Sequence, residues 1–335
     1  MKVYFDNAAT TVVRDEAIDA MVAVMKDDYG NPSSTHYMGR QAASLRELAR
    51  KNVATVIGAT PESIYFTSGG TESNNWAVLA LAEITARRGK HIITSDIEHS
   101  AVFEPIKKLE SLGWDITYLS PDSTGRITAE AFASALRDDT AFASIMMVNN
   151  ETGIINPITE YSKEIKHRKT STMLHTDAVQ GFCKIPFSVK TLGADLVSIS
   201  AHKMHGPKGA GALFVKPGLN IPQAQLGGGQ EGGKRPGTEG LPTIVGFGEA
   251  ARLSSLEQEE TTQTVKHLRE HLINRLKSDI PDVAFISSED GSPFILSISI
   301  PGHKSEVLMS FLEAEGICVS KSSACKKGAR SRVLE

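Results

Sequence analysis

The chain has 335 residues, of which 36 are lysine or arginine and 39 are aspartate or glutamate, so its formal net charge is −3. This length is sufficient for a large core and favours two domains, and the small net charge excludes a general attraction to nucleic acid or to an anionic membrane. The sequence contains no apolar run long enough to span a bilayer, and its N-terminus turns polar almost at once, so we expect a cytoplasmic protein without a signal peptide.

Short apolar runs alternate with helical patterns through the first two thirds of the chain. The spacing of apolar residues predicts helices at Arg14–Lys26, His36–Ile57, Glu72–Arg88, Ala101–Leu112 and Ala129–Leu136. Strands are predicted at Ile64–Thr67, His91–Thr94, Ile116–Leu119, Ala141–Val148, Met173–Thr176, Leu196–Ile199 and Ala212–Val215. Strands separated by helices indicate the α/β class, with a mainly parallel sheet covered on both faces. Such a sheet binds ligands beyond the carboxyl ends of its strands.

The pattern changes after Leu241. A long helical pattern with a polar patch at 254–264 is followed by a predicted strand, helix and strand at Phe294–Ile300, Ser305–Glu315 and Ile317–Ser320. This is the pattern of a smaller α+β unit. We therefore assign residues 14–255 to a large domain and residues 1–13 and 256–335 to a small domain.

Lys203 lies just beyond the predicted strand Leu196–Ile199 and is followed by a turn that contains Gly206 and Pro207. Partial burial at the end of a strand lowers the pKa of a lysine and frees its amine as a nucleophile, as a Schiff-base lysine requires. Considered alone, Lys203 also fits a surface lysine in a loop.

A glycine-rich turn, Thr67-Ser-Gly-Gly-Thr71, joins another predicted strand to the helix after it. The exposed N–H groups and the dipole at the start of a helix favour a phosphate, so Gly70 and Thr71 are candidate phosphate-binding residues. Because glycine-rich turns are common, an ordinary tight turn is the alternative.

Three further polar side chains, His99, Asn150 and Asp177, follow predicted strands. His99 suits stacking on a flat cofactor and proton transfer, although a lone loop histidine is more often a helix cap or a surface residue. Asn150 could donate to a phenolic oxygen, although asparagines at a strand end usually serve turn geometry. Asp177 suits a pyridinium nitrogen, which is its usual partner in pyridoxal-phosphate enzymes, unless it caps the next helix.

A glycine-rich turn, a histidine, an asparagine, an aspartate and a lysine thus follow one another along the chain, each after a predicted strand. With this series of groups, the chain resembles the pyridoxal-phosphate-dependent cysteine desulfurases of the class-V aminotransferase family. The matching stretches are Phe5–Thr11, Gly30–His36, Thr67–Glu72, Glu98–His99, Asn149–Glu151, Asp177–Gln180, Ser200–Lys203, Gly206–Gly209, Gly227–Glu231 and Arg235–Thr238. The resemblance implies the fold type I of pyridoxal-phosphate transferases, with a mainly parallel sheet in the large domain and a smaller α+β domain.

The resemblance also implies a role for each candidate residue. Lys203 carries the cofactor and moves a proton, Asp177 pairs with the pyridine nitrogen, and His99 stacks on the ring. Asn150 and Gln180 lie near the ring oxygen. The phosphate is bound by Gly70, Thr71, Ser200, His202 and, from the second subunit of a homodimer, Thr238. We read the segment 227–238 as mobile, or as a simple flexible linker.

The three cysteines, Cys183, Cys318 and Cys325, have no disulfide or zinc spacing, so we expect no metal site. Cys325 lies in a Ser/Gly/Lys-rich loop between Ala324 and Lys326, a setting that favours an accessible thiolate, although a loop cysteine without a role is the alternative. In the resembled family, the matching cysteine takes the sulfur of L-cysteine as a persulfide. Cys183 and Cys318 are expected to be structural.

The predicted function is therefore conversion of L-cysteine to L-alanine, with sulfur captured on Cys325 and passed to an acceptor or scaffold protein for iron–sulfur cluster or thio-cofactor synthesis. Two alternatives stay open: a selenocysteine lyase or another class-V aminotransferase, and a catalytically impaired cofactor-binding scaffold. The second alternative arises because the family continues for several dozen residues and supplies an arginine for the substrate carboxylate, which we do not identify here. We accordingly expect a small domain with exposed apolar surface and weaker substrate positioning.

Overall fold

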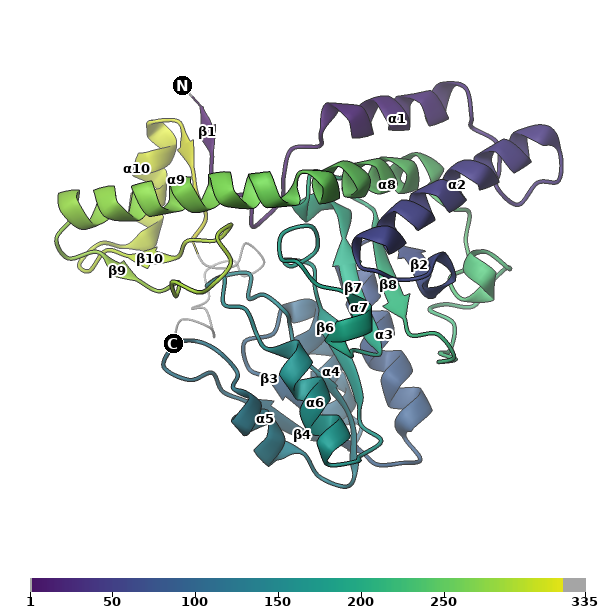
Figure 1. Ribbon diagram of the computed structural model, residues 1–335, viewed down its shortest axis with the longest axis horizontal. Coiled ribbons are helices and arrows are strands. Elements are labelled where there is room, and N and C mark those ends of the chain that lie inside the picture. The colour runs from purple at the N-terminus through teal and green to yellow at the C-terminus, as the bar shows by residue number, and fades with distance from the viewer. Residues whose placement is uncertain (1, 322–335) are drawn as a thin grey trace.

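The computed structural model describes residues 2–321, and it is organised around a central β-sheet (Figure 1). Within these residues the sheet has seven strands in the order β2-β8-β7-β6-β5-β3-β4. The strands are β2 (Ile64–Thr67), β3 (His91–Ser95), β4 (Asp115–Leu119), β5 (Thr140–Ser144), β6 (Met173–Asp177), β7 (Leu196–Ser200) and β8 (Gly211–Val215). Only β8 runs antiparallel to its neighbours, so the other strands end at the same edge.

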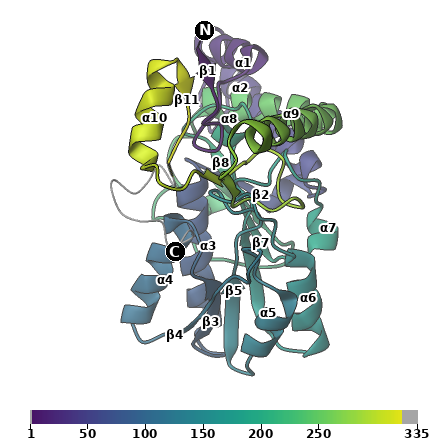
Figure 2. The same ribbon diagram turned by 90° about the vertical axis from the view of Figure 1, so that its left-hand side faces the viewer.

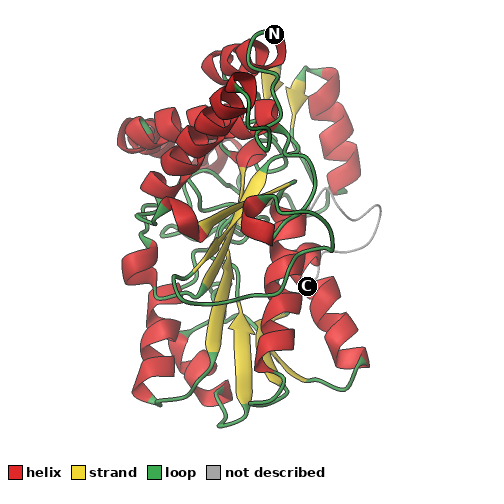
Figure 3. Cartoon of the chain, turned by 90° about the vertical axis from the view of Figure 1, so that its right-hand side faces the viewer, coloured by secondary structure: helices red, strands yellow, loops and turns green. Residues whose placement is uncertain are grey.

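Helices cover both faces of the sheet, as the alternating pattern predicts (Figures 2 and 3). One face packs on α3 (Gly70–Thr85) and α4 (Ser100–Ser111). The other face packs on helices from several separate parts of the chain. They are α2 (Tyr37–Val56), α5 (Ala129–Ala135), α6 (Ile158–His167) and α8 (Leu241–Leu256), with α1 (Asp15–Lys26) against α8 and the short α7 (Val189–Leu192) at the rim.

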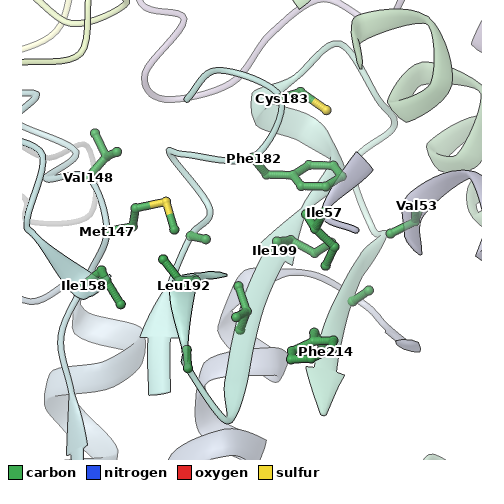
Figure 4. Close-up of a cluster of buried hydrophobic side chains, with 14 of the residues drawn as sticks. Val53, Ile57, Met147, Val148, Ile158, Phe182, Cys183, Leu192, Ile199 and Phe214 are labelled. Carbon is green, nitrogen blue, oxygen red and sulfur yellow. The ribbon is translucent and has the colours of Figure 1, made fainter. Parts of the chain in front are cut away.

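The central strands are buried throughout. Every residue of β3, β5, β7 and β8 is buried, which explains why these strands read as short continuous apolar runs rather than as alternating ones. In the core, Ile199 and Phe214 from the sheet lie beside Val53 and Ile57 of the α2 segment and Phe182 (Figure 4). Cys183 is buried at the same place, and burial raises the pKa of its thiol, as expected for a structural cysteine.

The structure corrects several predicted boundaries. β5 ends at Ser144 although the apolar run continues to Val148. The N–H groups of Ile145 and Met147 still donate to carbonyls of β6, but the Met146 N–H donates to the Glu98 carboxylate and not to a strand. The predicted strand Phe294–Ile300 is reduced to β10 (Ile298–Ser299). Helix α6 was not predicted, although Ile158, Tyr161 and Ile165 follow helical spacing.

The C-terminal elements are built differently from the central sheet. They are α9 (Gln258–Asp279), β9 (Ala284–Phe285), β10, α10 (Ser305–Ala314) and β11 (Ile317–Cys318), and β11 pairs in parallel with β1 (Val3–Tyr4) from the chain start. Within the described part of the chain, neither α9 nor α10 has a fully buried residue, and Leu268 and Phe311 are exposed. Apolar side chains of both helices are thus exposed among the described residues. Cys318, predicted to be structural in an apolar strand, is exposed, because β11 has only two residues and burial alternates along it, from half-buried Ile317 to exposed Cys318.

The glycine-rich segment 227–238 is held by charged side chains, contrary to the prediction that it is mobile or a simple linker. Glu231 is buried and accepts two hydrogen bonds of 2.7 Å from Arg50 of α2 and one from the N–H of Phe66 in β2. Arg235 pairs with Glu72 of α3 at 2.8 Å. One buried and one half-buried ion pair of this geometry fix the path of the segment, even though its backbone is rich in glycine.

A buried histidine joins the three central strands. The ring nitrogens of His175 in β6 lie 2.8 Å from the Ser144 hydroxyl of β5 and 3.0 Å from the Ser198 hydroxyl of β7. Burial lowers the pKa of His175 from 6.5 to about 3. The folded protein therefore holds this imidazole neutral, two residues before Asp177.

Replacing Arg50 by methionine should lower the free energy of unfolding by about 3 to 5 kcal/mol, because it leaves the Glu231 carboxylate buried without its cation. Chemical denaturation measures this change. Arg137→Met is the matched control, because Arg137 pairs with Asp115 and Asp139 on the surface and its loss should change stability little. Equal effects of the two substitutions would contradict a structural role for the Arg50–Glu231 pair.

The free energy of unfolding should depend on pH through His175. Between pH 6.5 and about 3 the unfolded chain binds a proton at this residue that the folded chain does not, so this contribution to stability is lost as the pH falls. The stability difference between the parent and His175→Gln should therefore narrow by up to about 1.4 kcal/mol per pH unit in this range. The same substitution at exposed His267 is the control. A difference that stays constant with pH would refute the prediction.

Candidate active site

Lys203 lies in a short 3-10 turn, Ala201–Lys203, directly after β7 at the edge where the parallel strands end. Its Nζ donates to the carbonyl of Ala8 and, at 2.8 Å, to that of Ala9. Thr11 contacts the same 3-10 turn, since its N–H and its hydroxyl each donate to the His202 carbonyl at 2.9 Å. The N-terminal segment 8–11 thus lies over the turn that carries Lys203, which sequence reasoning did not predict.

Asp177 ends the neighbouring strand β6 and is buried. Its Oδ2 accepts a hydrogen bond of 2.6 Å from Asn74 of α3, and its Oδ1 accepts one of 2.9 Å from the N–H of Val179. Burial raises the pKa of Asp177, while the nearby His99 and Lys203 act in the opposite direction. The predicted convergence of Asp177 and Lys203 is therefore present in the structure, with Asn74 as a partner that the sequence did not indicate.

His99 precedes α4 and caps it, because its Nδ1 accepts a hydrogen bond of 3.1 Å from the N–H of Ala101. The capping alternative is thus correct. The cap holds the imidazole close enough to Asp177 to lower the pKa of that carboxyl. Behind it, the Glu98 carboxylate accepts from Ser95 at 2.5 Å and from the Met146 N–H at 3.0 Å, and burial raises its pKa to about 8.

The glycine-rich turn brings the start of α3 against the ends of β6 and β7. Gly70 begins the helix, and a Cβ at this residue would stand 2.7 Å from Val179 Cγ2 and 3.7 Å from Ser200 Cβ. The backbone at Gly69 has φ 151°, and only glycine adopts such a value readily. Ser200 Oγ is buried and has no hydrogen-bond partner among the described residues. The Ser200 hydroxyl thus presents a donor without an acceptor beside the start of α3, as a phosphate site requires, whereas the N–H groups of Ser68 and Gly69 donate within the turn, to the Glu72 carboxylate and the Thr67 hydroxyl.

His202 and Gln180 complete this edge. His202 Nδ1 lies 3.2 Å from the Thr10 hydroxyl, and burial, together with the charge of Lys203, lowers its pKa to about 4. Gln180 is buried, and its Nε2 donates to the Ala8 carbonyl at 2.8 Å, the same carbonyl that accepts from Lys203.

The remaining candidates are less closely tied to this group. In the Asn149-Asn150 pair it is Asn149 that organises the loop, since its Oδ1 accepts from the N–H groups of Glu151 and Thr152, which confirms the turn alternative for Asn149. Asn150 is half-buried next to it. Thr238 is exposed in the segment 227–238, and Cys325 lies outside the described residues.

The residues at this edge fit pyridoxal 5'-phosphate. An amine, a buried acid and a helix start with an unpartnered hydroxyl match its aldehyde, its ring nitrogen and its phosphate in number and kind. Within residues 2–321 no group of three or more metal-ligating side chains occurs. No helix in this range has the length and the apolar character needed to cross a membrane.

Comparisons with known proteins agree with this reading. Residues 3–333 match the family model of the class-V aminotransferases. The chain is 44% identical to a cysteine desulfurase IscS of Dictyoglomus turgidum over 98% of this chain and 83% of the relative, and 42% identical to that of Methanosarcina thermophila over 98% and 80%.

Solved structures give the same result. A NifS-like protein superposes with a TM-score of 0.94 at 38% identity, covering 100% of this chain and 89% of that one. A NifS-like protein from Rickettsia africae gives 0.89 at 32% identity, with the same coverage. The chain therefore belongs to the class-V aminotransferase family, among its pyridoxal-phosphate-dependent cysteine desulfurases, which act on L-cysteine.

Proposed function

We propose that this cysteine desulfurase works at the sheet edge where Lys203 and Asp177 meet, and that Cys325 takes up the sulfur and passes it to an acceptor for iron–sulfur cluster or thio-cofactor synthesis. The observation that carries the proposal is the placement of a lysine amine and a buried carboxylate at the ends of two adjacent parallel strands. The selenocysteine-lyase and scaffold alternatives are less favoured, since the relatives at about 40% identity are named cysteine desulfurases.

Lys203 is proposed as the attachment point of the cofactor. Pyridoxal 5'-phosphate, when bound, supplies an electron sink that weakens the bonds to Cα of the amino acid. The carbonyls of Ala8 and Ala9 hold the Lys203 amine at the edge of the sheet, where it can reach the cofactor and later move a proton at Cα of the substrate.

Asp177 is proposed to pair with the ring nitrogen. Burial disfavours an isolated Asp177 carboxylate, so a protonated ring nitrogen would compensate its charge. Asn74 and the Val179 N–H hold both carboxylate oxygens in place for this pairing. His99, fixed as the cap of α4, is proposed to stack on the ring, with Asn150 and Gln180 on the ring-oxygen side.

Gly70, Thr71, Ser200 and His202 are proposed to bind the phosphate, with Thr238 contributed by a second subunit. The support is the unpartnered Ser200 hydroxyl beside the N-terminus of α3. Thr238 is exposed, while its segment is fixed by the ion pairs of Glu231 and Arg235. A fixed segment with an exposed hydroxyl is suited to serve the site of another copy, so we infer a homodimer.

Cys325 is proposed as the sulfur acceptor. Its thiolate attacks the sulfur of the substrate, so that an S–S bond forms while the Cβ–S bond of the substrate breaks, and the carbon takes up a proton to yield alanine. The persulfide then passes its outer sulfur to an acceptor or scaffold protein. Such a reduced thiol requires a reducing compartment, and together with the unpaired Cys183 and Cys318 it favours the cytoplasm.

The purified protein should show a visible absorption band of bound cofactor, and L-cysteine should change this band and release alanine and sulfide. Lys203→Ala should abolish the band and lower turnover by several orders of magnitude, because the covalent link to the cofactor is lost. Lys190→Ala, at an exposed position in α7, is the matched control and should behave like the parent. A visible band that persists in Lys203→Ala would refute the assignment of Lys203.

Cys325→Ser should abolish sulfide release in the presence of a reductant but leave the visible band, because the hydroxyl is a poor sulfur acceptor. Cys318→Ser replaces a cysteine that is exposed in the described part of the chain, and it should keep parent activity. Absorption spectra and sulfide assays on the same samples separate loss of cofactor from loss of sulfur transfer. Sulfide release by Cys325→Ser at the parent rate would exclude the persulfide mechanism.

A further inference from the structure

Lys184 is a second lysine behind the site, and the roles described so far make no use of it. It follows Asp177 and Gln180 in the turn after β6, and its backbone N–H donates to the Gly181 carbonyl at 3.0 Å. Its side chain is only 8% exposed. Lysine is almost never buried to this degree without a partner, so its position calls for a physical reason.

The contacts of Lys184 lead to the cofactor site. Its Nζ donates to the Oε1 of Gln180 at 3.3 Å, and the Nε2 of the same side chain donates to the Ala8 carbonyl at 2.8 Å. Lys203 donates to that carbonyl as well. A chain of hydrogen bonds therefore runs from Lys184 through Gln180 to the acceptor that holds the Lys203 amine. With its oxygen taken by Lys184, the Gln180 amide can present only its NH2 group to this side.

The charge of Lys184 has no carboxylate partner among the described residues. The amine also lies 5.8 Å from the centre of the Phe294 ring, a weaker kind of cation contact. The titratable groups that act on it are Lys203 and Cys183, and its own charge acts on His202. Burial, followed by repulsion from Lys203, lowers the pKa of Lys184 to about 7.

A positive charge on Lys184 affects the protonation of Lys203. Like charges disfavour each other, so a charged Lys184 favours the unprotonated state of the nitrogen of Lys203, the state that a nucleophile requires. It also adds positive potential on the side of Gln180, where the proposed ring oxygen carries negative charge. A methionine would fill the same volume without the cost of burying an amine, and it would have neither effect.

We propose that Lys184 is a positioning residue of the cofactor site, which fixes the orientation of the Gln180 amide and supplies positive charge beside Lys203. The inference rests on the proposed role of Lys203.

The test is a pH titration of the visible cofactor band in the holoenzyme. In Lys184→Met, the pH at the midpoint of this titration should rise by about half a pH unit or more, because the charge that repels a proton on the Lys203 nitrogen is gone. This shift corresponds to a roughly threefold change in the protonation equilibrium. Lys184→Arg keeps the charge and should restore the parent midpoint. Lys163→Met, an exposed lysine of α6, is the control for the substitution itself and should leave the midpoint unchanged.

A midpoint in Lys184→Met equal to that of the parent would overturn the proposal, since a side chain that only fills space leaves this equilibrium unchanged. If Lys184→Met does not retain the cofactor, Lys184→Gln serves instead, because it is neutral but still carries an amide donor. A higher midpoint pH in Lys184→Gln than in the parent would support the proposal, and an equal one would overturn it. A parent protein without a visible cofactor band would refute the role of Lys203, whereas a parent with this band and variants with an unshifted midpoint would refute the role of Lys184 alone.

Discussion

The burial of a carboxylate at the end of the central strand β6 is the constraint on which the rest of the site depends. Asp177 is removed from water, and its two oxygens are held by Asn74 and by the Val179 N–H. These contacts are neutral, so compensation of the charge must come from cations placed around it. The nearby Lys203 and His99 lower the pKa of Asp177, and a protonated ring nitrogen of the cofactor completes the arrangement that we propose.

Helix α3 links the two ends of the proposed cofactor site. Its first turn, with Gly70 against Val179 and Ser200, forms the proposed phosphate site, and one turn later Asn74 holds Asp177. One rigid helix packed on the sheet thereby sets the distance between the group that binds the phosphate and the group that binds the ring. Rigid elements position such groups more accurately than loops do.

Segments distant in sequence close the site from the outside. The N-terminal residues Ala8 to Thr11 hold the turn with His202 and Lys203 through backbone groups, and Glu231 fixes the glycine-rich segment to Arg50. Backbone carbonyls and buried ion pairs constrain these segments without any regular secondary structure. The same N-terminal segment accepts from Gln180, so the path of the chain before α1 and the polar network behind Lys203 depend on each other.

The amino-acid sequence by itself determined the α/β class, most helices and strands, and the convergence of Asp177, Lys203 and the glycine-rich turn. Apolar periodicity is local, and parallel strands bring their carboxyl ends to one edge whatever their detailed packing. Only the tertiary structure decided that β5 stops at Ser144, that ion pairs hold the segment 227–238, and that Asn74 contacts Asp177, Lys184 contacts Gln180 and the Ala8 carbonyl contacts Lys203. These features depend on contacts between residues far apart in the chain, and such contacts leave no local pattern in composition or spacing.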